Sequence, residues 1–239
     1  MDIIFPDFKT FKTKLIFYRI PKNASTSIYK HLGYTNVIKA AEKEIAEKAD
    51  ERLYRNIFET SHVKPEELKS FGLFDVKDYF SFCIVRNPWD RIVSMYKFSI
   101  LNKGLFKHIY NIDKEDFVSF CNVIKEREND KFFIGSHKQT EWIDSENPPD
   151  KILRFESIQK EFSDMINEIN LIGVSPELPH INKTEHKHYS EYYNTETKKI
   201  VSDVFAEDID NFKYSFEKEE TIKDEEVKDD DDTEGVLKI

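Results

Sequence analysis

Apolar residues in this chain fall into two patterns, short continuous runs and longer stretches at helical spacing. The runs at residues 14–20 (KLIFYRI), 79–85 (YFSFCIV) and 151–155 are rich in large aliphatic and aromatic side chains. Runs of this length and composition are typical of buried strands. Residues 56–60 form a weaker, shorter strand candidate.

Helical spacing follows each of these strands. The pattern predicts helices at residues 28–32, 39–54, 65–71, 88–100, from 113 onward, from 157 to about 173, and 195–212. Asn87, Asp113 and Ser157 are suited to cap three of them, and Pro88 suits a first helical turn. Strands that alternate with helices indicate βα units around a mostly parallel sheet, an α/β fold.

Composition narrows the class of protein. The chain has 239 residues, of which 39% are hydrophobic and 14% aromatic, enough for a globular core. Its two cysteines, Cys83 and Cys121, lie in apolar patterns and read as buried thiols of a reducing compartment. No apolar run approaches the roughly 18–20 residues that a bilayer requires, and the first residues do not resemble a signal peptide. We therefore expect a cytoplasmic protein without an integral membrane segment.

The negative charge is concentrated near the C-terminus. The formal net charge is −10, and residues 217–234 hold eleven acidic side chains against three lysines, a net of −8. Such a block repels itself, which favours disorder. We therefore predict a folded domain at residues 1–216 and an acidic, disordered tail at residues 217–239. The composition is not that of a nucleic-acid-binding protein.

The first motif with recognisable chemistry is PKNASTS, residues 21–27, which joins the first long strand to a helix. A loop that enters a helix offers backbone N–H groups to an anion. Ser25, Thr26 and Ser27 add hydroxyl donors and Lys22 adds a mobile positive charge. The order of residues is not that of a Walker A loop. An ordinary helix start with a surface lysine explains the same segment.

The second motif is VRNPWDRIVSMY, residues 85–96, at the end of the next strand. Arg86 lies where open α/β sheets place ligands, and Ser94 follows about two turns into the helix. An arginine with a hydroxyl can hold a second phosphate. For Arg91 the alternative is a salt bridge to a nearby acid, and for Trp89 we favour simple core packing.

Together the two motifs resemble the carbohydrate sulfotransferase family, especially its chondroitin-type Golgi branch. PKNASTS is similar to the family's 5′-phosphosulfate loop, and VRNPWDRIVSMY to its 3′-phosphate motif. Further similar segments are LRFE (residues 153–156), LPHINK (178–183), Tyr192-Tyr193 and DIDNFKY (208–214), so that the resemblance spans roughly residues 14–216. The resemblance implies a P-loop-NTPase-like, three-layer α/β fold, with a mostly parallel central sheet flanked by helices.

The same resemblance implies a donor and a set of roles. The donor would be 3′-phosphoadenosine 5′-phosphosulfate (PAPS), used without a metal, and the acceptor a hydroxyl, most simply on a carbohydrate. Lys22 would be catalytic, meeting the charge on the leaving group. The cofactor-binding residues would be Lys22, Asn23, Ala24, Ser25, Thr26 and Ser27 at the 5′ end, with Arg86 and Ser94 at the 3′-phosphate.

Several assignments stay open. The acceptor hydroxyl needs a base, and His62 resembles the strand-end histidine of heparan sulfate 2-O-sulfotransferases, although a surface-loop histidine fits equally. The basic cluster at residues 180–188 suggests a covering loop over the nucleotide or acceptor, with a plain solvated loop or a zinc site as alternatives. Gln139 and Trp142 are candidates to line the acceptor pocket. Alternative functions are a catalytically silent nucleotide- or glycan-binding module and a P-loop-type kinase; the oligomeric state is open.

Overall fold

A four-stranded sheet forms the centre of the computed structural model, which describes residues 2–4, 15–32, 64–65, 80–101, 116–130, 133–171, 173–179 and 187–217. The strands are β1 (Asp2–Ile4), β2 (Leu15–Tyr18), β3 (Phe80–Val85) and β4 (Lys151–Arg154), in that order across the sheet. β2, β3 and β4 are parallel, whereas β1 pairs antiparallel with β2 at the edge. The predicted α/β class with a mostly parallel sheet is confirmed; the three-residue edge strand β1 is too short to give a pattern in the sequence.

Six α-helices lie in the described part of the chain. They are α1 (Ser25–His31), α5 (Pro88–Leu101), α7 (Phe117–Glu126), α8 (Ile158–Glu168), α9 (Thr195–Val204) and α10 (Ala206–Phe212). Short 3₁₀ turns are η2 (Ile134–Ser136), η3 (Gln139–Trp142), η4 (Phe155–Ser157) and η5 (Tyr189–Tyr192). None of these helices is long and apolar enough to cross a bilayer.

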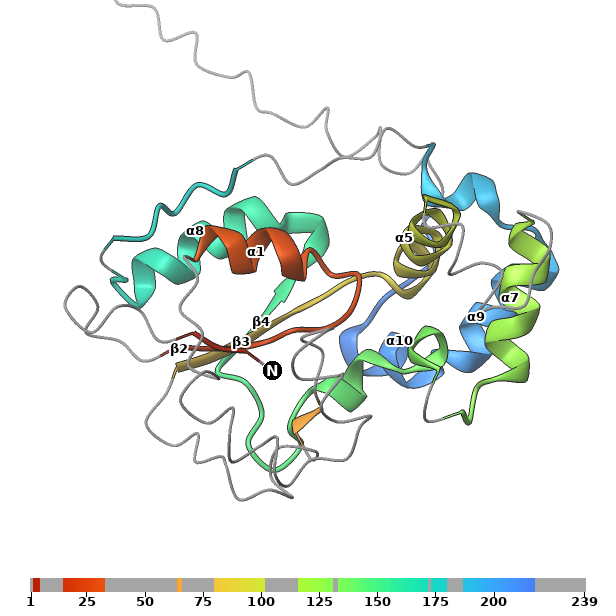
Figure 1. The fold of residues 1–239 in the computed structure, drawn as a ribbon, viewed down its shortest axis with the longest axis horizontal. Coiled ribbons are helices and arrows are strands. Elements are labelled where there is room, and N and C mark those ends of the chain that lie inside the picture. Colours follow the sequence, from red (N-terminus) through yellow and green to blue (C-terminus); the bar gives the residue numbers. More distant parts are fainter. Residues whose placement is uncertain are drawn as a thin grey trace, which may run out of the picture.

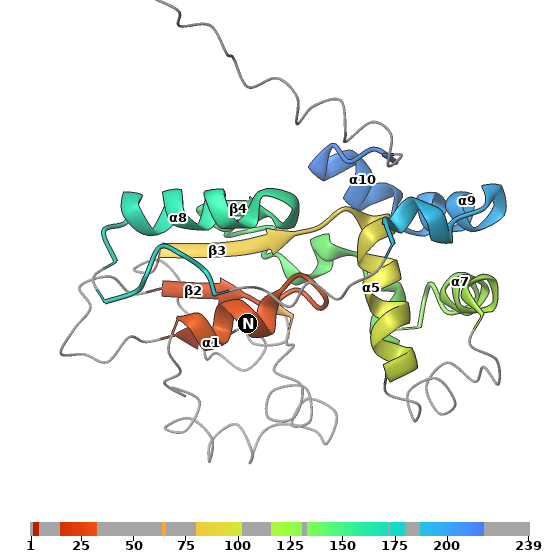
Figure 2. The ribbon, with the colours of Figure 1, turned by 90° about the horizontal axis from the view of Figure 1, so that it is seen from above.

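The core divides into two hydrophobic clusters. α1 and α8 lie side by side on one face of the sheet (Figures 1 and 2), and alternate strand residues such as Phe17, Phe82 and Leu153 point toward them. The second cluster packs α5, α7 and α9 together with Phe133 and Tyr189. α5 continues directly from β3, so that the two clusters meet at the carboxyl ends of the strands (Figure 1).

Capping explains several helix boundaries. Asn87 caps α5 as predicted, because its Oδ1 accepts from the N–H of Trp89 at 3.1 Å and Pro88 is the first helical residue. The cap of α7 is Asp116 rather than Asp113; its carboxylate accepts from the N–H of Ser119 at 2.8 Å.

Other predicted boundaries were also wrong. α1 begins at Ser25, three residues before the predicted start. Residues 195–212 form two helices, since Phe205 leaves helical geometry (φ −109°, ψ 25°) and buries its ring in the second cluster. α8 ends at Glu168, before Gly173. Just after its end, Asn170 adopts a left-handed conformation (φ 49°), and the N–H of Leu171 donates to the carbonyl of Ile166 at 3.2 Å.

Candidate functional site

The turn after β2 has a strained backbone that faces the start of α1. Lys22 and Ala24 have φ of 70° and 56°, the left-handed region that costs a non-glycine residue roughly 1–2 kcal/mol. Ala24 occupies the N-cap position of α1, and no side chain caps the helix. The N–H groups of its first turn therefore lack the acceptor that a Ser or Asp cap would provide. A turn of this kind can present backbone donors to an anion.

The three hydroxyl residues of this turn differ in exposure. Ser25 is buried, Ser27 half-buried and Thr26 exposed. Asn23, which the sequence grouped with them, is 1% exposed and directs its side chain into the protein. Its Nδ2 donates to the carbonyl of Ile84 at 2.7 Å, while its buried Oδ1 has no hydrogen-bond partner among the described residues. The side chain of Asn23 therefore anchors the turn, and only its backbone can face a ligand.

Lys22 points from this turn toward helix α5. Its Nζ lies 4.0 Å from the ring centroid of Phe98, which is 45% exposed. Burial, and then the positive charge of Arg86, lower the pKa of Lys22 to about 8. The ammonium group is thus mostly protonated at neutral pH and lies close to its titration point.

Arg86, the first residue after β3, is held in place by three neighbours. Its Nη1 donates to the carbonyl of Lys22 at 3.1 Å, and its Nε donates to Asp90 at 2.7 Å. The guanidinium stacks on the ring of Phe155, 4.0 Å from the centroid, at the end of β4. The structure therefore brings the two sequence motifs together at the carboxyl ends of three parallel strands, the usual ligand position in such sheets.

One stripe of α5 faces this pair of motifs. Asp90, Ser94 and Phe98 follow one another at four-residue spacing and so share a helix face. Asp90 contacts Arg86 at one end of the stripe and Phe98 contacts Lys22 at the other. Ser94, half-buried, lies between them. It is therefore on the surface shared by Lys22 and Arg86.

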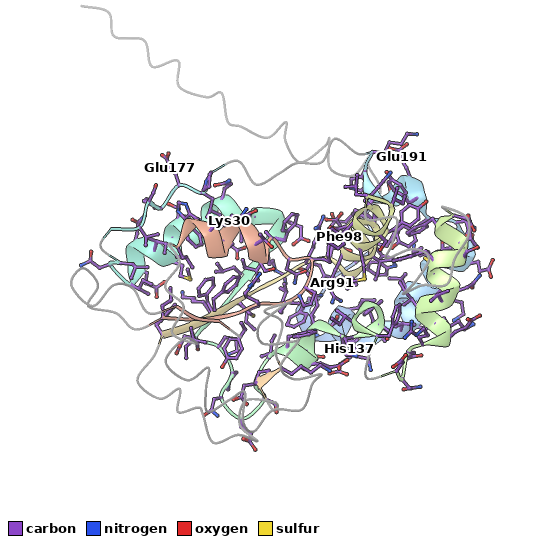
Figure 3. All side chains as sticks on the ribbon, viewed as in Figure 1. Lys30, Arg91, Phe98, His137, Glu177 and Glu191 are labelled. Carbon is purple, nitrogen blue, oxygen red and sulfur yellow. The ribbon has the colours of Figure 1, made fainter. Side chains whose placement is uncertain are left out.

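Arg91 links this site to the interior. It is 0% exposed, its Nε donates to the carbonyl of Pro21 and its Nη1 to that of His137, both at 3.1 Å. In Figure 3 it lies between Phe98 and His137, where the sheet meets the helices. The sequence left open a salt bridge of Arg91 to an acid. These two bonds go to backbone carbonyls, and the one to Pro21 fixes the turn at its first residue. Trp89 packs in the core as expected.

The remaining candidates behave differently. His62 lies outside the described residues. Two residues later, Lys64 forms an ion pair with Glu141 on η3. Gln139 and Trp142, the candidates for the lining of an acceptor pocket, are 0% and 3% exposed.

Only the end of the basic cluster at residues 180–188 is described. His188 caps η5, because its Nδ1 accepts from the N–H of Ser190 at 3.3 Å. Within the described ranges, no three His, Cys, Asp or Glu side chains are grouped as a metal site would require.

Residues 8–215 match the model of the sulfotransferase family, which is most of the chain and includes both motifs. The chain belongs to the sulfotransferase family. This sulfotransferase matches no curated protein and no solved structure. The family confirms the predicted enzyme class and its P-loop-like fold, while the chondroitin-type branch rests on the sequence resemblance alone.

Two groups in this sulfotransferase escaped the sequence analysis. Phe98 appeared only as one residue of the helix predicted at residues 88–100, and Gln139 only as a candidate for the lining of an acceptor pocket. Nothing in the local pattern marks either residue, because their contacts are with segments about 50 to 115 residues away in the chain. The one available signal was for Arg91, whose charge stands among apolar residues in VRNPWDRIV.

Proposed function

We propose that this sulfotransferase moves the sulfuryl group of PAPS to a hydroxyl of a carbohydrate. The observation that carries the proposal is the contact between the two motifs, in which Arg86 bonds the carbonyl of Lys22. A nucleotide with anionic groups at two separate ends suits two adjoining sites for anions. A nucleotide such as ATP carries all its phosphates at one end and would leave the second site unused.

The site residues divide between the two ends of the donor. The N–H groups at the start of α1, with Ser25, Thr26 and Ser27, would hold the 5′-phosphate. Arg86 and Ser94 would hold the 3′-phosphate. The two hydrogen bonds that Arg86 makes to Lys22 and Asp90 use only two of the five N–H donors of a guanidinium. Within the described residues the other donors make no hydrogen bond, and they would bind phosphate oxygens at a guanidinium that is largely buried.

Transfer itself requires charge stabilisation more than covalent catalysis. The acceptor oxygen forms a bond to sulfur while the bond from sulfur to the bridging phosphate oxygen breaks, and the electron pair stays on the phosphate. Lys22 would neutralise that growing charge. The proton of the acceptor hydroxyl passes to a base, for which His62 is our candidate.

We also propose that the enzyme works in the cytoplasm. Cys83 and Cys121 are free and buried, as expected for thiols in a reducing compartment. Burial raises the pKa of Cys121 to about 12, and the negative charge of Asp116 adds to this shift. Cell fractionation tests the assignment: activity confined to a membrane or secreted fraction would overturn it.

The first experiment compares ligands and a single substitution. We expect 3′,5′-ADP to raise the melting temperature more than 5′-AMP or ATP does, because only it occupies both sites. Lys22→Met should lower kcat about 10²- to 10³-fold, as loss of one transition-state donor does, while 3′,5′-ADP binds within about ten-fold of wild type. Lys30→Met, at an exposed lysine on α1, is the matched control and should change neither quantity.

Each alternative predicts a different result. A kinase would be stabilised by ATP and not by 3′,5′-ADP. A silent module would bind PAPS yet transfer no sulfate to any member of a panel of sugars, lipids and simple alcohols. Transfer to lipids or alcohols but not to sugars would reject the carbohydrate acceptor while keeping the donor.

A further inference from the structure

Gln139 joins the two motifs from inside the protein. It is 0% exposed, and its side-chain amide touches both segments. Its Oε1 accepts from Asn23 Nδ2 at 2.6 Å and from the backbone N–H of Arg86 at 2.9 Å. Its Nε2 donates to the carbonyl of Arg86 at 2.9 Å. One amide group thus bonds the turn after β2 and the end of β3 at once.

The backbone of Gln139 is itself fixed by a buried carboxylate. Asp208 on α10 accepts from the N–H of Gln139 at 2.8 Å and from that of Thr140 at 3.1 Å. Asp208 is 0% exposed; burial raises the pKa of its carboxyl, and the positive charge of Arg91 opposes that shift. The amide of Gln139 therefore cannot move far without breaking a second set of hydrogen bonds.

These contacts give Gln139 a different task from the ligand-binding residues. It is fully buried beneath the site and does not reach its surface, yet it bonds the backbone of Arg86 and the side chain that anchors Lys22's turn. We propose that Gln139 is a positioning residue that sets the spacing between the segments that bind the two ends of the nucleotide. This inference rests on the proposed function, since it assumes a ligand with two anionic ends.

The proposal predicts a particular kind of defect. A ligand that engages two linked sites gains affinity only when both can be engaged together, and that gain is lost when their spacing changes. A ligand with one phosphate uses one site and is insensitive to the spacing. The quantity to measure is therefore the ratio of the affinities for 3′,5′-ADP and 5′-AMP.

Gln139→Met tests the idea because methionine has a similar length but none of the hydrogen bonds. By calorimetry we expect the affinity for 3′,5′-ADP to fall about ten-fold or more, while that for 5′-AMP changes less than about two-fold. In steady-state kinetics with PAPS, KM should rise and kcat should fall together, because the sulfuryl group is also misplaced.

Ser136→Ala is the matched control for general loss of stability. Ser136 is 2% exposed in the same segment, and its hydroxyl bonds only the nearby carbonyls of Arg127 and Phe133 among its described partners. It should lower the melting temperature without changing the affinity ratio. If Gln139→Met does not fold, Asp208→Asn carries the same test, because an amide at this position loses an acceptor for the N–H groups of Gln139 and Thr140.

The outcomes separate the two proposals. Equal losses of affinity for both ligands, or an unchanged ratio with a lowered melting temperature as in Ser136→Ala, would overturn the role of Gln139. A wild-type protein that shows no preference for 3′,5′-ADP over 5′-AMP would instead reject the proposed function itself.

Discussion

Lys22 combines a strained backbone, partial burial and a neighbouring cation in one residue. Its φ of 70° turns the chain toward the start of α1, and its side chain extends over Phe98. Burial and Arg86 both disfavour its charged form, which lowers its pKa to about 8. The protein thus keeps a positive charge beside the transfer site at neutral pH, at a cost that an anionic ligand would offset.

This pKa makes a pH prediction for the free enzyme. Because kcat/KM reports groups in the free enzyme, kcat/KM for PAPS should fall above pH 8 as Lys22 loses its proton. A bound phosphosulfate favours the ammonium form and raises its pKa, so the decline in kcat should begin at a higher pH than the decline in kcat/KM. Initial rates measured from pH 6.5 to 10 give both profiles.

The control is Lys22→Arg, whose guanidinium stays protonated over this range. Whatever the absolute activity of this variant, its kcat/KM profile should lack the decline near pH 8. A wild-type profile that is flat to pH 10, or a decline that Lys22→Arg retains, would show that another group titrates.

The sequence marked Lys22 and Arg86 as candidates for this site, but it gave no sign that Gln139 joins their two segments. Lys22 and Arg86 belong to motifs whose chemistry is local, so their types and spacing carry the information. Gln139 acts through hydrogen bonds to residues 53 and 116 positions away. In the sequence Gln139 looks like an ordinary loop residue, because the segments that it bonds come together only in the folded protein. No pattern in the neighbouring residues indicates these bonds.

Some helix boundaries are set by neighbouring residues and can be predicted from the sequence, whereas others depend on distant contacts and cannot. Asn87 caps α5 through a bond to Trp89, two residues on, and the sequence shows it. The break at Phe205 depends on burial of its ring among α5, α7 and α9, and it also turns α10 so that Asp208 meets Gln139. The apolar positions over residues 195–212 predict one continuous helix, and they do not show that burial of the Phe205 ring breaks it in two.

The start of α1 offers a test of strain in an element. Ala24 has φ of 56° at the N-cap position, where glycine pays no steric cost. Ala24→Gly should therefore stabilise the ligand-free protein by about 1 kcal/mol, measured by urea unfolding.

Ala206→Gly is the matched control, since Ala206 is exposed at the start of α10 with helical geometry. There the backbone is already helical, so glycine relieves no strain and the same change should destabilise by up to about 0.5 kcal/mol. If both substitutions destabilise to the same extent, the turn before α1 holds no strain that glycine can relieve.

The whole molecule places its site where the two hydrophobic clusters meet. The sheet with α1 and α8 supplies the turn at Lys22, and α5, which packs in the other cluster, supplies Ser94 and Phe98 (Figure 2). Periodicity predicted that each helix has an apolar face but not which helices share a core. The site is therefore sensitive to anything that shifts one cluster against the other. Gln139 bonds Asn23, in the turn after β2, and Arg86, just before α5, so it joins segments from the two sides.

Net charge acts on the molecule as a whole. Phe216 packs against Trp89 and Tyr189, and the N–H of Glu217 donates to Tyr189 Oη at 2.7 Å. The sequence predicts that the acidic stretch beyond is disordered and contributes only charge. Residues 218–239 carry a net charge of −6 out of −10. Such a charge repels an anionic nucleotide over about one Debye length, roughly 10 Å at 0.1 M salt.

Removal of residues 218–239 should therefore strengthen nucleotide binding only where salt does not screen the charge. We expect the Kd for 3′,5′-ADP to fall about two- to five-fold at 20 mM salt and to equal that of the full chain at 0.5 M. The melting temperature should stay within about 1 °C. A full-length variant with residues 229–232 (DDDD) changed to asparagine is the matched control, because it removes four of the negative charges at constant length. It should reproduce most of the gain.

Weaker binding or a clearly lower melting temperature after truncation would mean that the segment packs on the domain, because loss of a purely electrostatic repulsion can produce neither result.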